Sequence, residues 1–291
     1  MTTSTVTLRR IGYFAGYLDL AKPKSIIAHL ITAAAGVVLA AGGRPQVDIL
    51  VFTLGGGACL AAAANALNSY LDRDIDALML RTSRRPLPSG RVAPDRALGL
   101  GAGLGAVGML ILGLWVNWLS AAIAVAALAY YGLYTLFLKR RSRWAAVAGS
   151  GAGALPPLIG WVAVTNRIEM TPLVLSLMIA LWTLPHFWAL AIYRREDFER
   201  AQLRVMHAKG VFGSIAGCSL LLTAASLLLW RVAHLGPIYL TVASLLGSGL
   251  LGLALTLRRG DKTAAARRLY GYSIAYIAVI FAAMIVDTIV L

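Results

Sequence analysis

Residues 65–91 read NALNSYLDRDIDALMLRTSRRPLPSGR and join the end of a long apolar run to a polar segment. If helical geometry continues into this segment, Asn68, Asp72 and Asp76 lie four residues apart and share one face, with about 6 Å between neighbours. Asp74 then points away from that face. Two carboxylates one turn apart, with an amide one turn below, suit a hard cation such as Mg²⁺, which can clamp a phosphate or diphosphate.

The same stretch supplies cations and buried amides. Arg81, Arg84 and Arg85 follow the acidic residues and carry planar, forked donors that match phosphate oxygens. Asn65 and Asn68 lie at the end of a span rich in Gly and Ala, where an amide is costly unless it has polar partners. The stretch therefore predicts a polar cavity at one end of an apolar helix bundle.

Composition places this stretch in a membrane protein. Of 291 residues, 59% are hydrophobic and 13% are charged, and the mean hydropathy is +0.76. These values predict an all-α, polytopic bundle of about nine transmembrane helices. The apolar runs cover residues 25–42, 48–69, 97–114, 117–138, 145–164, 172–192, 211–230, 237–257 and 269–290.

The basic residues orient these spans. With the N-terminus inside, all 27 Lys and Arg except Arg44, Arg167 and Arg231 fall on inner segments. This bias predicts a cytoplasmic N-terminus, a site at the cytoplasmic side and a bacterial plasma membrane. It also explains the net charge of +15 without nucleic-acid binding. Residues 1–21 are expected to form a polar N-terminal arm, and residues 22–291 a single transmembrane domain.

A second polar cluster follows the sixth span, in LWTLPHFWALAIYRREDFERAQLRVMHAKG (residues 181–210). His186 lies within the membrane part of this segment, and an intramembrane ionisable group is either a hydrogen-bonded core residue or a functional one. Tyr193, Arg194 and Asp197 lie beyond the span. Four spans separate the two acidic clusters, so both face the same side and could meet in one pocket.

The end of the fourth span also bears on that pocket. Tyr130, Tyr131 and Tyr134 approach the inner face ahead of Lys139 and Arg140. They could be interfacial tyrosines beside topogenic cations, or a cavity wall with cations that reach a diphosphate.

Two positions in the spans, a proline pair and an aspartate, carry expectations of their own. Pro156–Pro157 must break or kink the fifth span, which either shapes the bundle or opens carbonyls to a cavity. Asp287, near the outer end of the last span, is expected to reach water.

Each acidic cluster alone is ambiguous, because a carboxylate pair could cap a helix, pair with arginine or line an ion path. Together they indicate a site for an amphiphile, with a diphosphate head held by Mg²⁺ and arginines and an apolar tail in the membrane. A prenyl diphosphate fits this description. A transporter is less favoured, since the charges lie at one membrane face and not along a path.

These residues resemble a known family. The pattern Asn68-x-x-x-Asp72-x-x-x-Asp76, nine spans and an acidic motif after the sixth span are similar to the UbiA superfamily of intramembrane prenyltransferases. More narrowly, residues 72–90, 153–165 and 182–198 resemble the protoheme IX farnesyltransferases, or haem O synthases. The resemblance runs from about Lys22 to Asp287.

The resemblance implies roles for individual residues. Asn68, Asp72 and Asp76 would bind one Mg²⁺, and Asp197 would help with a second ion or the diphosphate. The implied diphosphate and substrate contacts are Arg81, Arg85, Lys139, Arg140, Tyr193 and Arg194. His186, with Trp182, Phe187 and Trp188, would face the porphyrin. Two Mg²⁺ ions, farnesyl diphosphate, haem B and membrane lipid are the implied ligands, and haem A synthase or terminal oxidase assembly the implied partners.

The implied reaction joins the vinyl group of haem B to farnesyl, with water addition, to give haem O. One alternative is another aromatic acceptor, such as a quinone precursor. The other is a weakened homologue that binds haem or prenyl lipid as an assembly factor. The weakened-homologue alternative is supported by a departure from the family pattern: residues 201–207 read AQLRVMH, where the family has a Gly- and Pro-containing run. Ala145 likewise stands where the family has an asparagine.

Overall fold

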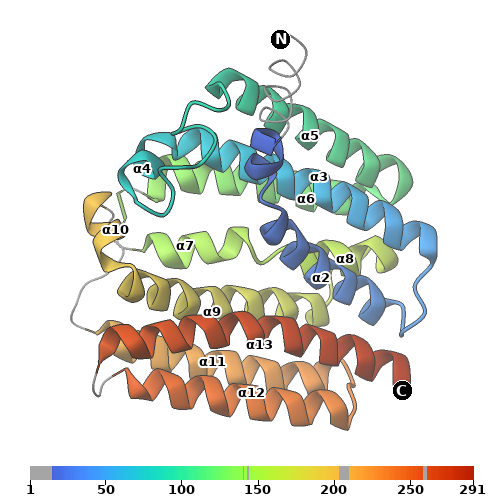
Figure 1. Cartoon of the computed structure of the whole chain (residues 1–291). Coiled ribbons are helices and arrows are strands. Elements are labelled where there is room, and N and C mark those ends of the chain that lie inside the picture. Colours follow the sequence, from blue (N-terminus) through green and yellow to red (C-terminus); the bar gives the residue numbers. More distant parts are fainter. Residues whose placement is uncertain (1–14, 140, 143, 203–209, 258–260) are drawn as a thin grey trace, which may run out of the picture.

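The computed structural model describes residues 15–139, 141–142, 144–202, 210–257 and 261–291 (Figure 1). The described residues form helices and connecting loops with no strand, and nine helical segments among them are long and apolar enough to cross a membrane. The predicted all-α bundle of nine spans is therefore confirmed. The spans are Pro23–Ala40 (α2), Val47–Leu71 (α3), Pro94–Trp115 (α5), Trp118–Leu138 (α6 and η1), Ala145–Thr165 (α7 and α8), Met170–Tyr193 (α9), Val211–Val232 (α11), Pro237–Thr256 (α12) and Lys262–Val290 (α13).

The helix ends follow local chemistry. Pro23, Pro94 and Pro237 each open a helix, where the missing N–H costs nothing. Asn117 caps α6 by accepting from the Ser120 N–H at 2.8 Å. The short gap between the apolar runs 97–114 and 117–138 is a tight turn in the structure, since α5 ends at Trp115 and α6 begins at Trp118.

The fifth span is broken where the sequence predicts it. The helix α7 covers Ala145–Ala152, and α8 begins again at Pro156 and runs to Thr165. The interruption lies within the span, and Gly153, Leu155 and Pro156 line an internal cavity described below. The proline pair thus ends one half-helix and starts the next, as proline allows at a first helical turn.

The expectation for Asp287 is wrong. Its side chain is 1% exposed, and its carboxylate accepts hydrogen bonds from the N–H groups of Gly236 and, at 3.0 Å, Tyr239. These two residues lie at the start of α12, whose first N–H groups lack helical partners. Asp287 therefore caps a neighbouring helix and does not reach water.

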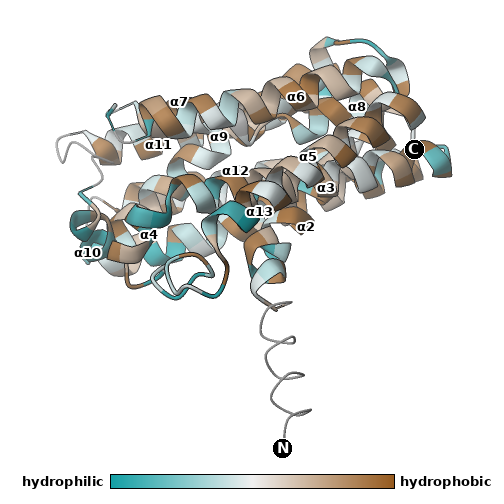
Figure 2. Cartoon of the chain, turned by 90° about the horizontal axis from the view of Figure 1, so that it is seen from above, coloured by the Kyte–Doolittle hydropathy of each residue, from teal (hydrophilic) through white to brown (hydrophobic). Residues whose placement is uncertain are grey.

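Two short helices sit together at one end of the bundle. These are α4 (Arg73–Leu78), which follows α3, and α10 (Arg195–Arg200), which follows α9; both lie at the left of Figure 1. Figure 2 shows hydrophobic residues along the long helices and hydrophilic residues at the end that carries α4 and α10. The described end of the N-terminal arm, residues 15–21, is helical, and its Leu20 packs with Leu87 and Val92. The two acidic clusters thus occupy one end of the molecule.

Candidate active site

The first acidic cluster has the predicted helical register. The helix α3 ends at Leu71, yet the Asp72 N–H bonds the Asn68 carbonyl at 2.9 Å and the Asp76 N–H bonds the Asp72 carbonyl at 2.8 Å. Asn68, Asp72 and Asp76 are 8%, 3% and 4% exposed, whereas Asp74 is exposed. The three polar side chains therefore share a buried face, and Asp74 lies on the other face.

Both buried carboxylates have a cation partner. Arg85 Nη1 donates to Asp76 Oδ1 at 2.8 Å and to Oδ2 at 2.7 Å. Lys139 Nζ pairs with Asp72 Oδ2, so the residue that follows η1 (Tyr134–Leu138) contributes a cation to the cluster. Asp72 Oδ1 is buried and has no hydrogen-bond partner among the described residues. One carboxylate oxygen thus remains available for a further positive ligand.

The Asn68 amide ties α3 to two other helices. Its carboxamide lies 2.7 Å from the Tyr131 hydroxyl of α6. With its nitrogen toward the carboxylate, Asn68 donates to Asp72 Oδ2 at 2.8 Å and accepts from Lys22 Nζ at 3.2 Å, and this orientation satisfies both ends of the amide. Of the two interpretations of the inner tyrosines, Tyr131 thus fits the cavity wall.

Lys22 is a site residue that the sequence analysis did not assign. It precedes Pro23 and has φ 53° and ψ 69°, a left-handed conformation that is unusual before proline. The pKa of its ammonium is lowered to about 8, mainly by burial; the Arg85 and Lys139 charges act in the same direction, and Asp76 and Asp72 oppose the shift. The Lys-Pro pair at the inner start of the first span was the available signal.

The second acidic motif meets the first, as its spacing predicts. Asp197 is 5% exposed, and its Oδ1 accepts from the Leu80 N–H at 2.9 Å, which joins α10 to the loop after α4. Burial lowers the pKa of Arg81, as does the charge of Arg85, whereas Asp76 and Asp197 act in the opposite direction. Arg81 thus stands between the two acidic motifs.

His186 lies beside this cluster and has a defined tautomer. The Ser273 hydroxyl donates its single hydrogen to the Tyr270 carbonyl at 2.7 Å. His186 Nδ1, 2.8 Å from that hydroxyl oxygen, must therefore be the donor, so the lone pair of the neutral imidazole is on Nε2. The imidazole stacks 4.7 Å from the Trp182 ring and 4.7 Å from the Tyr270 ring. Tyr270 in turn interacts electrostatically with Arg81.

Two of the predicted site residues, Tyr193 and Arg194, are not in this cluster. Arg194 lies 4.6 Å from the centroid of the Tyr193 ring, and Arg267 of α13 lies 5.8 Å from the same ring. Tyr193 and Arg194 therefore face α13. Arg140 and residues 203–207 of the altered loop lie outside the described residues.

An apolar cavity of about 200 Å³ extends from the cluster into the bundle between α2, α3, α6 and the fifth span. Tyr131 and Asn65 line one part of its wall, and the remaining lining is mostly Ala, Leu and Gly. Along α3 the lining runs from Asn65 to Thr53, which spans about 18 Å at 1.5 Å per residue. The cavity can therefore take a chain-like apolar group whose head lies at the carboxylates.

The donor set fits Mg²⁺ in part. The described residues hold no group of three His, Cys, Asp or Glu side chains placed to bind one metal ion. Asp72 and Asp76 with the Asn68 amide nevertheless supply hard oxygen donors, and Asp72 Oδ1 lacks a partner. Arg85 and Lys139 occupy the other carboxylate oxygens, so a cation could enter once these side chains move to a bound anion.

Comparison with known proteins gives a consistent result. The model of the UbiA prenyltransferase family matches residues 29–283. The protein named Protoheme IX farnesyltransferase from Symbiobacterium thermophilum is 43% identical over 278 residues, which cover 93% of each chain. A protein of the same name from Azotobacter vinelandii is 43% identical over 99% of this chain and 98% of that protein. A third, from Roseiflexus castenholzii, is 40% identical, and this chain spans 55% of its length.

Solved structures show the same fold. A digeranylgeranylglyceryl phosphate synthase has a TM-score of 0.79 at 19% identity, over 96% of this chain and 99% of that chain. A UbiA homolog from Archaeoglobus fulgidus, bound to DMAPP and Mg²⁺, has a TM-score of 0.61 at 18% identity, over 92% of this chain and 98% of that chain. At such identities the likeness extends to the fold alone.

Proposed function

Because the chain belongs to the UbiA prenyltransferase family, we propose that it transfers a farnesyl group from farnesyl diphosphate to haem B, giving haem O for terminal oxidases. The observation that carries this proposal is near full-length identity of 43% to proteins named Protoheme IX farnesyltransferase. These names do not favour another aromatic acceptor or a binding-only homologue. The chain is a multi-pass membrane protein, and we place its N-terminus and its site on the cytoplasmic side of the plasma membrane.

The cations of the cluster supply the diphosphate site. Arg85 and Lys139 neutralise Asp76 and Asp72 in the structure, and Lys22 and Arg81 lie beside them. When farnesyl diphosphate enters, these cations can turn toward its oxygens and stabilise the charge that develops on the leaving group. The same side chains therefore keep the carboxylates paired before binding and serve the anion afterwards.

Asn68, Asp72 and Asp76 would hold one Mg²⁺, and Asp197 would contribute to a second ion or to the diphosphate. Support comes from the hard oxygen donors, from the unpartnered Asp72 Oδ1 and from a UbiA homolog bound to DMAPP and Mg²⁺. When bound, Mg²⁺ would neutralise diphosphate oxygens and so ease departure of that group. Asp197, held by the Leu80 N–H, keeps the loop of Arg81 against this site.

The apolar cavity would take the farnesyl chain. Its wall excludes water from the allylic carbon, which is needed because early attack by water would only hydrolyse the substrate. As the bond from farnesyl C1 to oxygen breaks, a vinyl carbon of haem B forms the new carbon–carbon bond and diphosphate leaves. Water then adds to the cation beside the porphyrin and loses a proton. His186, with its free Nε2, would face the porphyrin.

The test of this proposal is product analysis in cells that lack their own haem O synthase. Cells that express the chain should contain haem O by mass spectrometry, and cells that express Asp72→Asn should contain only haem B. Haem B alone in both, with the protein present in the membrane fraction, would reject the proposed reaction. Haem A synthase and the terminal oxidase are the proposed users of the product.

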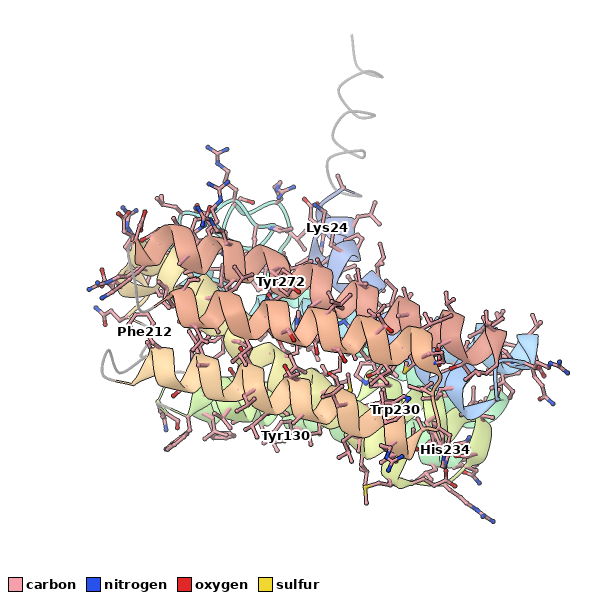
Figure 3. The ribbon with its side chains drawn as sticks, turned by 90° about the horizontal axis from the view of Figure 1, so that it is seen from below. Lys24, Tyr130, Phe212, Trp230, His234 and Tyr272 are labelled. Atoms are coloured by element: carbon pink, nitrogen blue, oxygen red, sulfur yellow. The ribbon has the colours of Figure 1, made fainter. Side chains whose placement is uncertain are left out.

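Lys22→Gln should weaken binding of farnesyl diphosphate roughly tenfold or more, because a charged hydrogen bond contributes about 1.5–3 kcal/mol. Lys22 Nζ lies at the Asn68 amide within the cluster. Lys24→Gln is the matched control: it removes the same charge from an exposed side chain in the same helical turn, and Lys24 is labelled in Figure 3. Calorimetric titration with farnesyl diphosphate and Mg²⁺ measures both. Equal affinities for Lys22→Gln and the wild type would remove Lys22 from the diphosphate site.

A further inference from the structure

A second groove, of about 950 Å³, opens at the end of the bundle that carries the first turns of α13. Tyr193 of α9 and Arg267, Arg268 and Tyr272 of α13 line it. The Tyr272 hydroxyl donates to the Leu246 carbonyl of α12 at 3.0 Å, so this ring closes the groove on the α12 side, where Figure 3 labels it. The groove is separate from the apolar cavity and from the buried carboxylates.

The groove carries unbalanced positive charge. The Tyr193 ring has two guanidinium groups on it, from Arg194 at 4.6 Å and from Arg267 at 5.8 Å, and Arg268 adds a third. None of the salt bridges between described residues includes these arginines. Asp261, the acid in the lining, uses its Oδ1 to cap α13 through the Thr263 and Ala264 N–H groups. Arginine forks in this number match a ligand with more than one carboxylate.

The groove also has a fixed relation to His186. Tyr193 follows His186 by seven residues, so both lie on one face of α9, about 10 Å apart along the axis. The antiparallel α13 follows the same seam, since His186 contacts Ser273 while Tyr193 meets Arg267. In its neutral form the His186 imidazole therefore keeps the Nε2 lone pair inside the membrane, and the arginines lie toward the surface. Haem B has the same order of groups, with iron at its centre and two propionates along one edge.

We propose that Arg194, Arg267 and Arg268 bind the two propionates of haem B. The acceptor then lies along the α9–α13 seam, with its propionate edge at the membrane surface and its remaining edges toward His186 and the carboxylate cluster. This inference rests on the proposed function, because it names the subsite for that acceptor. It also assigns Arg194 to the acceptor and not to the diphosphate. An anionic lipid would match the arginines but would not account for the alignment with His186.

The test is an absorbance titration of the purified, full-length protein in neutral detergent with ferric haem B and, in parallel, with its dimethyl ester. The double variant Arg194→Gln/Arg267→Gln should bind haem B at least about tenfold more weakly than the wild type, since charged hydrogen bonds are lost. The dimethyl ester should bind both proteins equally weakly. Farnesyl diphosphate should bind both with the wild-type affinity, which also shows that the variant is folded.

Lys262→Gln is the matched control, because Lys262 is a cation at the start of the same helix, α13, and lies on the Phe212 ring, 5.3 Å from its centroid. It should bind haem B like the wild type. Equal haem affinity for the double variant and the wild type would overturn the inference, as would a loss of farnesyl diphosphate affinity in its place. The inference would also be overturned if Arg194→Gln/Arg267→Gln kept the wild-type haem affinity and changed only the binding of phosphatidylglycerol in lipid nanodiscs, because the arginines would then bind lipid. A wild type that binds no haem would instead overturn the proposed function.

Discussion

Asp72→Asn and Asp76→Asn are each expected to lower haem O formation by a hundredfold to a thousandfold or more, the cost of removing one preorganised charge-stabilising group from an active site. Both side chains are buried on the face that would hold Mg²⁺ and diphosphate, and asparagine keeps their shape while it removes a negative oxygen. Asp74→Asn makes the same chemical change two residues away on the exposed face, so it should retain most activity. Turnover of the purified variants with farnesyl diphosphate and haem B measures the difference.

Loss of folding must be separated from loss of chemistry. Removal of the Asp72 charge leaves the half-buried Lys139 ammonium, whose side chain is 25% exposed, without its partner. Breaking a fully buried pair costs about 3–5 kcal/mol, and the exposure of Lys139 makes the cost smaller here. The double variant Asp72→Asn/Lys139→Gln removes both charges and should recover much of the thermal stability, while it stays inactive. Equal loss of turnover in all three single aspartate variants would contradict the helical register and the assignment of the buried face.

The register of the acidic cluster could be predicted because it depends on local geometry. A helix that carries Asn68 carries Asp72 and Asp76 on the same face whatever surrounds it, and the structure keeps the two hydrogen bonds that this requires. The nine spans are likewise a property of composition along the chain. The even number of intervening spans placed Asp197 on the same side as the first motif, where the two could meet, and the Leu80 contact shows that they do.

Pairings between helices could not be predicted in this way. Nothing local shows that Lys139 pairs with Asp72 or that Lys22 reaches Asn68. These contacts depend on how α2, α3 and η1 pack. The error at Asp287 has the same origin, because its partners belong to the start of α12. A charged residue near the end of a span can either cap a neighbouring helix or reach water, and the packing of the helices decides which.

Backbone contact between α2 and α8 gives the second large expected effect. A Cβ added at Gly160 would lie 2.1 Å from the Ala33 carbonyl oxygen, and one added at Gly36 would lie 2.3 Å from the Pro157 carbonyl oxygen. Both obstacles are backbone atoms, which a rotamer change cannot move. Small residues allow such close approach of helices in a membrane. The two helices must therefore separate if either glycine is replaced.

Gly160→Ala is expected to destabilise the protein by at least about 1–3 kcal/mol, the usual cost of overpacking, and so to lower Tm by several degrees. Gly55→Ala is the control: its added Cβ meets nothing within 4 Å, so better helix propensity should leave Tm equal or slightly raised. Thermal unfolding in detergent compares them, and an unchanged Tm for Gly160→Ala would contradict the close contact.

Because one separation of α2 from α8 relieves both clashes, Gly36→Ala/Gly160→Ala should destabilise the protein by less than the sum of its single variants. That separation would also widen the apolar cavity, whose wall includes Ala33 and Ile159, so farnesyl transfer should lose efficiency even below Tm.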